Sequence, residues 1–278
     1  MKQKSYDEKP TVYLVPTPIG NMDDMTIRSI NILKEVEVIF SEDTRETIKL
    51  LKYFEINKKL IAAHEHNEDK VKLKMLDYLQ KGHSVALVTD RGTPIISDPG
   101  YKCATYIIDN GYNVVGLPGP TALIPALIMS GLEPHPFLFY GFLNSKKSKR
   151  KKELIILKEY QFTIIFYETP HRIKESLEDM FNILGNRKIS IIREISKKFE
   201  EVYRDNLEEI IKYLDTIKGE IVIVVEGNKE EHIIDIPIND HIKLLINDGI
   251  STNEAIKMVS KIHKTDKNEV YKNYHKGK

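Results

Sequence analysis

The chain has 278 residues, 41% of them hydrophobic and 30% charged, which predicts a soluble globular protein of one large or two ordinary domains. The single cysteine, Cys103, excludes an internal disulfide framework and a zinc site built from several cysteines, and the net charge of +1 favours no class of partner. No apolar run reaches 18 residues and the start MKQKSYDEKP is polar, so we expect neither a membrane span nor a targeting peptide, and a cytoplasmic protein.

Short apolar runs alternate with longer segments of helical periodicity along most of the chain. In residues 26–36 and 69–80, apolar residues recur at the spacing of one helix face. Strands alternating with such helices predict an α/β protein with largely parallel sheets. The predicted strands cover residues 11–15, 36–41, 60–64, 84–90, 113–117, 137–142, 162–168, 188–194 and 219–227.

The best candidate for an internal boundary is LPGPTA at residues 117–122, where Pro-Gly-Pro breaks regular structure. From residue 239 onward only helices are predicted, and Ser251 with Glu254 fits the start of one of them as a capping box. These tail helices are predicted over 241–248, 251–264 and 266–276. We therefore expect an N-terminal α/β domain (1–117), a second α/β domain (118–232) and a basic, helix-turn-helix-like appendage (233–278).

Two segments concentrate positive charge. KKSKRKK, residues 146–152, has six basic side chains in seven residues, and residues 257–278 contain seven lysines against Asp266 and Glu269. Each cluster fits the electrostatic footprint of a polyanion. Each also fits a solvated helix face in a lysine-rich chain, and the sequence leaves both readings open.

Several well-known ligand motifs are missing. The chain has no G-x-G-x-x-G after a strand, no G-x-x-x-x-G-K-[ST] and no G-x-S-x-G. His64 and His66 in HEHNE would share one face of a strand, but a polar strand end explains them better than a metal site. We predict no metal.

Loops rich in Pro, Gly, Asp, Thr and Arg follow the predicted strands. In open α/β sheets, ligands bind outside the carboxyl ends of the strands, and Pro and Gly hold backbone groups where they can face a ligand. A single such loop is ordinary, but a series along one sheet edge predicts a binding site. These loops are VPTPIGN (15–21), SEDTRE (41–46), HEHNE (64–68), TDRGTPIISDPG (89–100), PGPTA (118–122), YETPHR (167–172) and REISKKFEE (193–201).

The same stretches, extended to VPTPIGNMDDMT, VTDRGTPIISDPGY, PGPTALIPAL, REISKKFEEVYR and KGEIVIVVEG, resemble the tetrapyrrole (corrin/porphyrin) methylase family in order and spacing over residues 11–275. The branch of the family that they resemble acts on ribosomal RNA. The resemblance implies two α/β domains with S-adenosylmethionine in the cleft between them, and usually a homodimer. It further implies methylation of the ribose 2′-hydroxyl of a decoding-centre cytidine in 16S ribosomal RNA of the small subunit.

The resemblance also implies which residues hold the cofactor. The loop from Asp90 to Asp98 would cradle it, with the methionine part lying along a tight backbone. The residues carried over are Pro16, Asp90, Gly92, Thr93, Ile95, Ser97, Asp98, Thr121, Ala122 and Tyr167. Relatives usually have alanine where this chain has Arg91, so we expect Arg91 to point to solvent or to reach toward an RNA phosphate or a carboxylate.

A ribose hydroxyl is a poor nucleophile, so a base within hydrogen-bond reach would help. Asp43, Glu65, Glu168, Glu194 and Lys198 lie on the candidate loops. We predict that Glu168 or Glu194 takes the proton and that Arg45 or Arg193 grips phosphate. The alternative is that Asp43–Arg45 and Arg193–Glu194 are structural ion pairs.

For RNA binding, the Lys-rich run between a strand and a helical stretch is predicted to be a mobile loop. The residues assigned to RNA are Lys146, Lys147, Lys149, Arg150, Lys151, Lys152, Lys198 and Lys267. Two other functions stay open at this point. One is C-methylation of a tetrapyrrole precursor or another small molecule, and the other is a non-catalytic RNA-binding or ribosome-assembly factor.

Overall fold

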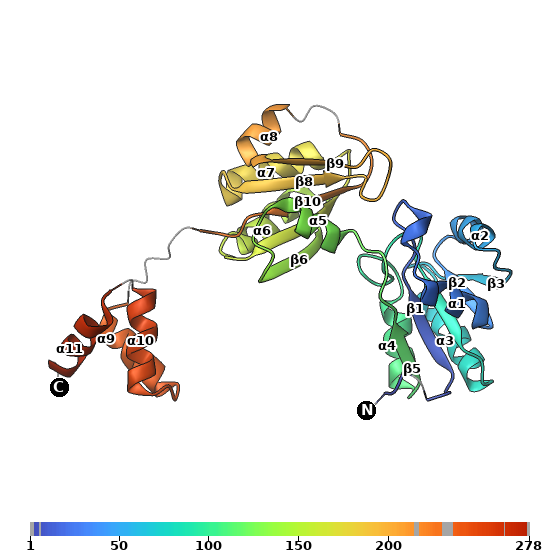
Figure 1. The fold of residues 1–278 in the computed structure, drawn as a ribbon, viewed down its shortest axis with the longest axis horizontal. Helices are drawn as coiled ribbons and strands as arrows, with labels where there is room; N and C mark the ends of the chain where they lie inside the picture. Colours follow the sequence, from blue (N-terminus) through green and yellow to red (C-terminus); the bar gives the residue numbers. More distant parts are fainter. Residues whose placement is uncertain (1–2, 6, 214–216, 230–235, 264, 277–278) are drawn as a thin grey trace. The chain divides into compact units, whose positions relative to one another are not determined.

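The computed structural model describes residues 3–5, 7–213, 217–229, 236–263 and 265–276. They form two compact units, Met1–Asn228 and Lys229–Lys278, and the larger unit contains two sheets (Figure 1). We call the part around the first sheet, residues 11–117, the first lobe, and residues 118–228 the second lobe. The boundary predicted between residues 232 and 233 lies outside the described residues.

The first lobe is built on a parallel sheet in the order β3-β2-β4-β1-β5. Its central strands β2 and β4 are buried throughout, as expected for parallel strands covered on both faces. The strands are β1 (Thr11–Val15), β2 (Val38–Ser41), β3 (Lys59–Ala62), β4 (Val85–Val88) and β5 (Asn113–Gly116). Their order confirms the parallel sheet predicted for this part of the chain.

Helices cover both faces of this sheet. Leu33 and Leu51 of α1 and α2 pack on one face, and Met75 and Ile107 of α3 and α4 pack on the other. The helices of this lobe are η1 (Met22–Asp24), α1 (Ile27–Glu35), α2 (Thr44–Tyr53), α3 (Glu68–Gln80) and α4 (Tyr101–Asp109). This layering places all the loops that follow the strands at one edge of the sheet.

The second lobe has a mixed sheet in the order β6-β7-β10-β8-β9. Only β6 and β7 run parallel, whereas β10 is antiparallel to β7 and β8, and β9 is antiparallel to β8. The prediction of largely parallel sheets is therefore wrong for this lobe. The strands are β6 (Phe137–Phe142), β7 (Thr163–Glu168), β8 (Lys188–Arg193), β9 (Glu201–Asn206) and β10 (Ile221–Val225).

Strand β9 was not predicted, because it is an edge strand with a polar sequence, EVYRDN, and none of its residues is buried. The loop between β8 and β9 covers only residues 194–200, too short for the crossover that parallel strands need, so the two strands pair antiparallel. Helix α5 packs on one face of the sheet and α6, α7 and α8 on the other. These helices are α5 (Leu123–Ser130), α6 (Lys147–Leu157), α7 (Ile173–Leu184) and α8 (Leu207–Tyr213).

The Lys-rich run is helix, not the predicted mobile loop, because all of it after Lys146 lies in the first turns of α6. Helical spacing puts Arg150 on the same face as Leu154 and Leu157, which pack in the core. The Arg150 side chain is 0% exposed, and its guanidinium donates to Asp179 at 2.8 Å and Glu175 at 3.1 Å. The RNA-binding role predicted for Arg150 is therefore wrong.

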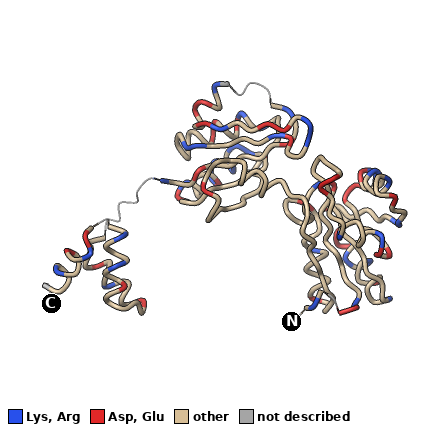
Figure 2. The backbone as a smooth tube through the Cα atoms, in the orientation of Figure 1, with Lys and Arg blue, Asp and Glu red and all other residues tan. Residues whose placement is uncertain are grey.

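The smaller unit contains α9 (Ile238–Asn247), α10 (Thr252–Ile262) and α11 (Lys267–Lys276) around its own apolar core. Ser251 accepts a hydrogen bond from the Glu254 amide at the start of α10, which confirms the N-cap half of the predicted capping box, and the Ser251 hydroxyl donates to the Glu254 carboxylate. Figure 2 shows acidic as well as basic positions on these helices. None of the helices in the described part of the chain combines the length and apolarity that a membrane span needs.

Candidate functional site

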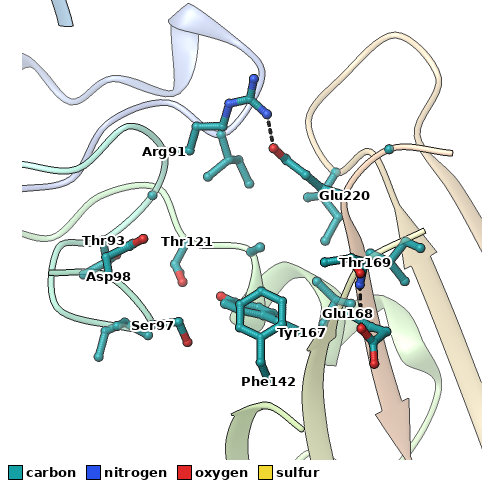
Figure 3. A pocket seen from close by; sticks show the side chains of 18 of the residues that line it. Arg91, Thr93, Ser97, Asp98, Thr121, Phe142, Tyr167, Glu168, Thr169 and Glu220 are labelled. Atoms are coloured by element: carbon teal, nitrogen blue, oxygen red, sulfur yellow. Dashed lines mark hydrogen bonds and ion pairs between the residues drawn. The ribbon is translucent and has the colours of Figure 1, made fainter. Parts of the chain in front are cut away.

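A pocket lies where loops of the first lobe face loops of the second (Figure 3). Its volume is about 280 Å³, close to the lower end of the range of small-molecule sites. We call it the main pocket. Its lining residues are Ile19, Arg91, Gly92, Thr93, Ile96, Ser97, Asp98, Thr121, Ala122, Phe142, Tyr167, Glu168, Thr169, Pro170, Ile195, Gly219, Glu220, Ile221 and Val222.

The first-lobe wall is the loop after β4, whose backbone is held in an uncommon conformation. Ile95 has φ 77° and Ser97 has φ 66°, although neither is glycine. Such conformations persist only where surrounding contacts fix them, and they gather at functional sites. Here Thr17 and Gly92 exchange two backbone hydrogen bonds of 2.9 Å, and the Thr93 hydroxyl donates to the Pro120 carbonyl at 3.0 Å. The loops after β1, β4 and β5 are thus tied into one rigid wall.

The second-lobe wall includes a segment that was not predicted to be part of the site. Residues 219–222 lie at the start of β10, and prediction considered only the carboxyl ends of strands. Because β10 is antiparallel to β7 and β8, its first residues lie at the same edge as their last ones. Ile221 pairs with Glu168 on one side and with Arg193 on the other.

One ion pair joins the two walls. The Arg91 guanidinium donates to the Glu220 carboxylate, and Figure 3 shows the two side chains facing each other. Of the orientations predicted for Arg91, the reach toward a carboxylate is therefore the one observed. Both side chains are about half exposed, at 55% and 53%.

Comparison with known proteins agrees with this architecture. A model of the tetrapyrrole (corrin/porphyrin) methylases matches residues 11–211. This chain belongs to the tetrapyrrole methylase family. The predicted fold class is confirmed, and so is the cofactor, since methylases of this family depend on S-adenosylmethionine.

Two relatives of this methylase match nearly its whole length. The ribosomal RNA small subunit methyltransferase I of Bacillus subtilis strain 168 is 45% identical over 286 residues, 99% of this chain and 98% of the relative. The protein of the same name from Halalkalibacterium halodurans is 44% identical over 285 residues, 98% of each. The uroporphyrin-III C-methyl transferase of Thermus thermophilus, solved with S-adenosyl homocysteine, shares the fold, with a TM-score of 0.55 at 18% identity over 78% of this chain and 97% of its own.

Most of the residues predicted to hold the cofactor gather in the main pocket of this methylase. Gly92, Thr93, Ser97, Asp98, Thr121, Ala122 and Tyr167 all line it. Pro16, Asp90 and Ile95 do not. The Pro16 ring packs closely on Gly119, the Ile95 side chain lies near Gly100, and Asp90 accepts a hydrogen bond from the Asp43 amide outside the pocket.

The pocket suits the methyl donor of this family. Ile19, Ile96, Phe142, Ile195 and Val222 give it apolar walls for a flat base, and the loop after β4 presents polar groups. The pKa of Asp98 is raised to about 7, first by burial and then by the charges of Glu42 and Asp90, against a hydrogen bond with Thr89. A carboxyl placed there would ionise readily beside a cationic ligand.

The two acids predicted as bases have different surroundings. The Glu168 side chain is 1% exposed, and its oxygens accept from the Thr169 amide at 2.8 Å and the Ser176 hydroxyl at 2.5 Å. Glu194, with φ 52°, accepts from the Glu220 amide at 3.0 Å and from Lys197 at 2.8 Å, and its side chain is 20% exposed. Glu168 is therefore fixed to α7, whereas Glu194 stands beside the pocket residues Ile195 and Gly219.

The basic residues predicted to grip phosphate already have acidic partners. Arg45 pairs with Asp43 at 2.6 Å, and its hydrogen bonds lower the pKa of Asp43 to about 2. Arg193 pairs with Glu201 at 3.2 Å rather than with Glu194. Asp43–Arg45 is thus the structural pair considered as the alternative, while Arg193–Glu194 is not formed.

The remaining predicted RNA contacts lie on the surface. Lys146, Lys147, Lys149, Lys152, Lys198 and Lys267 are exposed, and the Lys151 side chain is 44% exposed, 3.7 Å from Asp179. Lys198 lies over the Phe199 ring. Their role in RNA binding stays a prediction. Among the described residues, no three or more potential metal ligands gather, including those around His64 and His66.

Proposed function

We propose that this chain transfers a methyl group from S-adenosylmethionine to the ribose 2′-hydroxyl of a cytidine in the decoding centre of 16S ribosomal RNA. The observation that carries this proposal is the 45% identity, over 99% of the chain, with a protein named ribosomal RNA small subunit methyltransferase I. That match spans both walls of the main pocket and the C-terminal helices. The substrate would be the RNA within the small ribosomal subunit, in the cytoplasm.

We assign the cofactor to the main pocket, held by the loop from Gly92 to Asp98 together with Thr121, Ala122 and Tyr167. When bound, S-adenosylmethionine supplies a methyl group activated by a positively charged sulfur. The rigid backbone of the loop after β4 orients it without reorganisation. The ionised Asp98 carboxylate stabilises its positive charge, and Phe142 and Tyr167 exclude water from that end of the pocket.

We assign the general base to Glu194 rather than Glu168. Both oxygens of Glu168 accept hydrogen bonds from Thr169 and Ser176, and its side chain is 1% exposed, which leaves little of the carboxylate open to a substrate. The partly exposed Glu194 carboxylate accepts the proton of the 2′-hydroxyl, while Lys197 fixes its orientation. Glu168 then has a positioning role, joining the pocket end of β7 to α7.

The RNA would contact the exposed lysines of α6 and the basic C-terminal helices, each phosphate contact steepening the salt dependence of binding. We further propose that the active form is a homodimer. Ile124 and Ile128 of α5 are 43% and 72% exposed and give an apolar face from which such a contact could be built. Sedimentation of the purified protein tests this part of the proposal.

The deciding experiment is methylation of small ribosomal subunits with tritiated S-adenosylmethionine. The label is mapped by the resistance of the 2′-O-methylated linkage to alkaline cleavage. Label at one ribose in the decoding region is the expected result. Label on neither subunits nor free RNA, despite tight cofactor binding, would favour a small-molecule acceptor, and absence of cofactor binding would favour a non-catalytic RNA-binding factor.

The base is tested separately by single-turnover methylation. Glu194→Gln should lower the rate at saturating substrate with little change in cofactor affinity. Glu168→Gln should instead lower thermal stability, because Gln cannot accept both hydrogen bonds as well as a carboxylate does. An unchanged rate in Glu194→Gln would remove that residue from the proton transfer.

A further inference from the structure

A second hollow adjoins the main pocket, and the two share one lining residue, Arg91. This second hollow has a volume of about 370 Å³. It is lined by Thr17, Pro18, Gly20, Met22, Glu46, Thr47, Lys49, Leu50, Thr89, Asp90, Arg91 and Lys197. Three cations and the two carboxylates of Glu46 and Asp90 thus line a space beside the site assigned to the methyl donor, where an acceptor has to lie.

Two of these cations share an acidic partner of the second lobe, and the third pairs within its own helix. Lys49 pairs with Glu46 on its own helix at 2.6 Å. Arg91 and Lys197 instead share one carboxylate, Glu220, which Lys197 contacts at 3.0 Å. Lys197 also contacts Glu194 at 2.8 Å. Within the described part of the chain, Glu220 is therefore the carboxylate that contacts both Arg91 and Lys197.

The backbone holds both cations in place. Arg91 directly precedes Gly92, whose backbone bonds to Thr17 fix the loop. The stem of Lys197 crosses Gly20 so closely that a Cβ there would lie 2.3 Å from its Cγ. Ser196, which precedes Lys197 and has φ 69°, donates its hydroxyl hydrogen bond to Asp24 of the first lobe. The loop after β8 is thus anchored across both lobes at this point.

The ion pair between Arg91 and Glu220 is easily exchanged. Arg91 and Glu220 are each more than half exposed, and exposed ion pairs contribute little because solvent and salt screen them. A phosphodiester carries one negative charge, as Glu220 does, and it accepts the two parallel hydrogen bonds that a guanidinium offers. The phosphate can therefore supply, between the two cations, the same single negative charge that Glu220 supplies there.

We propose that Arg91 and Lys197 form a subsite for one backbone phosphate of the RNA acceptor, and that Glu220 occupies it until the RNA binds. The phosphate replaces the Glu220 carboxylate between the two cations, next to both hollows. This inference rests on the proposed function, since it takes RNA to be the acceptor. It assigns to Glu220 the role of an internal competitor.

The test compares substitutions whose effects on RNA binding differ in sign. Affinity is measured with purified small ribosomal subunits and with free 16S RNA over a series of salt concentrations. Arg91→Gln and Lys197→Gln should each weaken binding about fivefold and reduce the salt slope by roughly 0.7 to 0.9. Glu220→Gln, which removes the competitor, should strengthen binding about twofold to threefold. Lys34→Gln is the matched control, an exposed lysine in the last turn of α1, away from the strand ends that form the site.

If the network only clamps the two lobes together, Arg91→Gln and Glu220→Gln break the same contact and must change affinity in the same direction. That result would overturn the proposal. The double variant Arg91→Glu with Glu220→Arg restores an ion pair between the two lobes but puts a carboxylate where the phosphate would meet Arg91. It should therefore bind RNA as weakly as Arg91→Gln. Wild-type affinity in the double variant would also overturn the proposal.

The same measurements separate this inference from the proposed function. A wild-type protein that neither binds nor labels RNA contradicts the proposed function. A wild-type protein that labels RNA, with Arg91→Gln equal to Lys34→Gln in affinity and salt slope, contradicts only the phosphate subsite.

Discussion

The two lobes place site residues at a sheet edge in different ways. In the first lobe every strand is parallel, so the loops after β1, β2 and β4 meet at one edge. In the second lobe the same edge combines the end of β7 with the beginning of the antiparallel β10. In a parallel sheet, the loops that form a site can be predicted because each follows a strand in the sequence. In a mixed sheet, the prediction also requires knowing which strands pair and in which direction.

One ion pair from each lobe shows how burial changes the contribution of a charged residue to stability. The Asp43–Arg45 pair of the first lobe lies at the surface, with the Arg45 side chain 85% exposed. The Arg150–Asp179 pair of the second lobe is buried, with side chains 0% and 3% exposed. Removing one partner of a buried pair leaves an uncompensated charge, while removing one partner of an exposed pair leaves a solvated charge. These two pairs should therefore respond differently when the arginine is removed.

The largest effect is expected at Arg150. Arg150→Ala should lower the free energy of unfolding by about 3–5 kcal/mol, because Asp179 loses its partner inside the protein. Lys149→Ala, one residue earlier on the exposed face of α6, should change it by less than about 0.5 kcal/mol. Urea unfolding measures both. Equal effects of the two substitutions would mean that Arg150 is not buried as described.

The second largest effect is expected at Gly219, two residues before β10 begins. It has φ +92°, and a Cβ there would lie 2.3 Å from the Glu194 Oε1 atom. Gly219→Ala should destabilise the protein by about 2 kcal/mol and displace Glu194, thereby lowering the methylation rate. Gly82→Ala is the first-lobe control, because Gly82 has φ +86° but no atom within 4 Å of the added Cβ. An unchanged rate in Gly219→Ala would separate Glu194 from the chemistry.

A somewhat smaller effect is expected at Asp98 in the first lobe. The pKa of Asp98 in the folded protein is about 7, above the ordinary value of 3.8. Between pH 3.8 and pH 7 the folded state therefore holds a proton that the unfolded state has lost. The free energy of unfolding consequently falls as the pH rises from about 4 to about 7. Asp98→Asn should therefore raise the free energy of unfolding by about 1–2 kcal/mol at pH 8, allowing for solvent screening, and leave it unchanged below pH 4.

The same substitution has a functional counterpart. Wild-type affinity for S-adenosylmethionine should rise with pH up to about 7, as Asp98 ionises, and Asp98→Asn should flatten this dependence. Calorimetry over a pH series measures it, with the exposed Asp109→Asn as the control. A pH dependence that persists in Asp98→Asn would assign the titration to another group.

The smallest effect is expected at Arg45. Arg45→Ala removes an exposed partner of Asp43, which still accepts the backbone hydrogen bond at the start of α2. Thermal stability should not change measurably, in contrast to Arg150→Ala. A clear loss of stability in Arg45→Ala would contradict the difference between the exposed and the buried pair. A loss of RNA affinity alone would instead support the phosphate role predicted for Arg45.

The local sequence by itself determined most of the secondary structure and the position of the ligand-binding loop. The apolar runs and the capping residues predicted nine of the strands and the helices of the C-terminal unit, because burial periodicity and caps act over a few residues. The Pro- and Gly-rich loop TDRGTPIISDPG could be read as a ligand loop because its residue types fix an irregular backbone wherever the chain places them.

Only the tertiary structure decided which charged residues are buried and which distant segments meet at the pocket. Whether Arg150 lies in a polyanion-binding surface or in the core depends on which face of α6 packs against α7. The contribution of Gly219 and Glu220 to the pocket depends on the antiparallel pairing of β10, and the partner of Arg91 lies 129 residues away in the chain. Long-range strand pairing and helix packing are set by the summed burial of distant segments, which no short window of sequence contains.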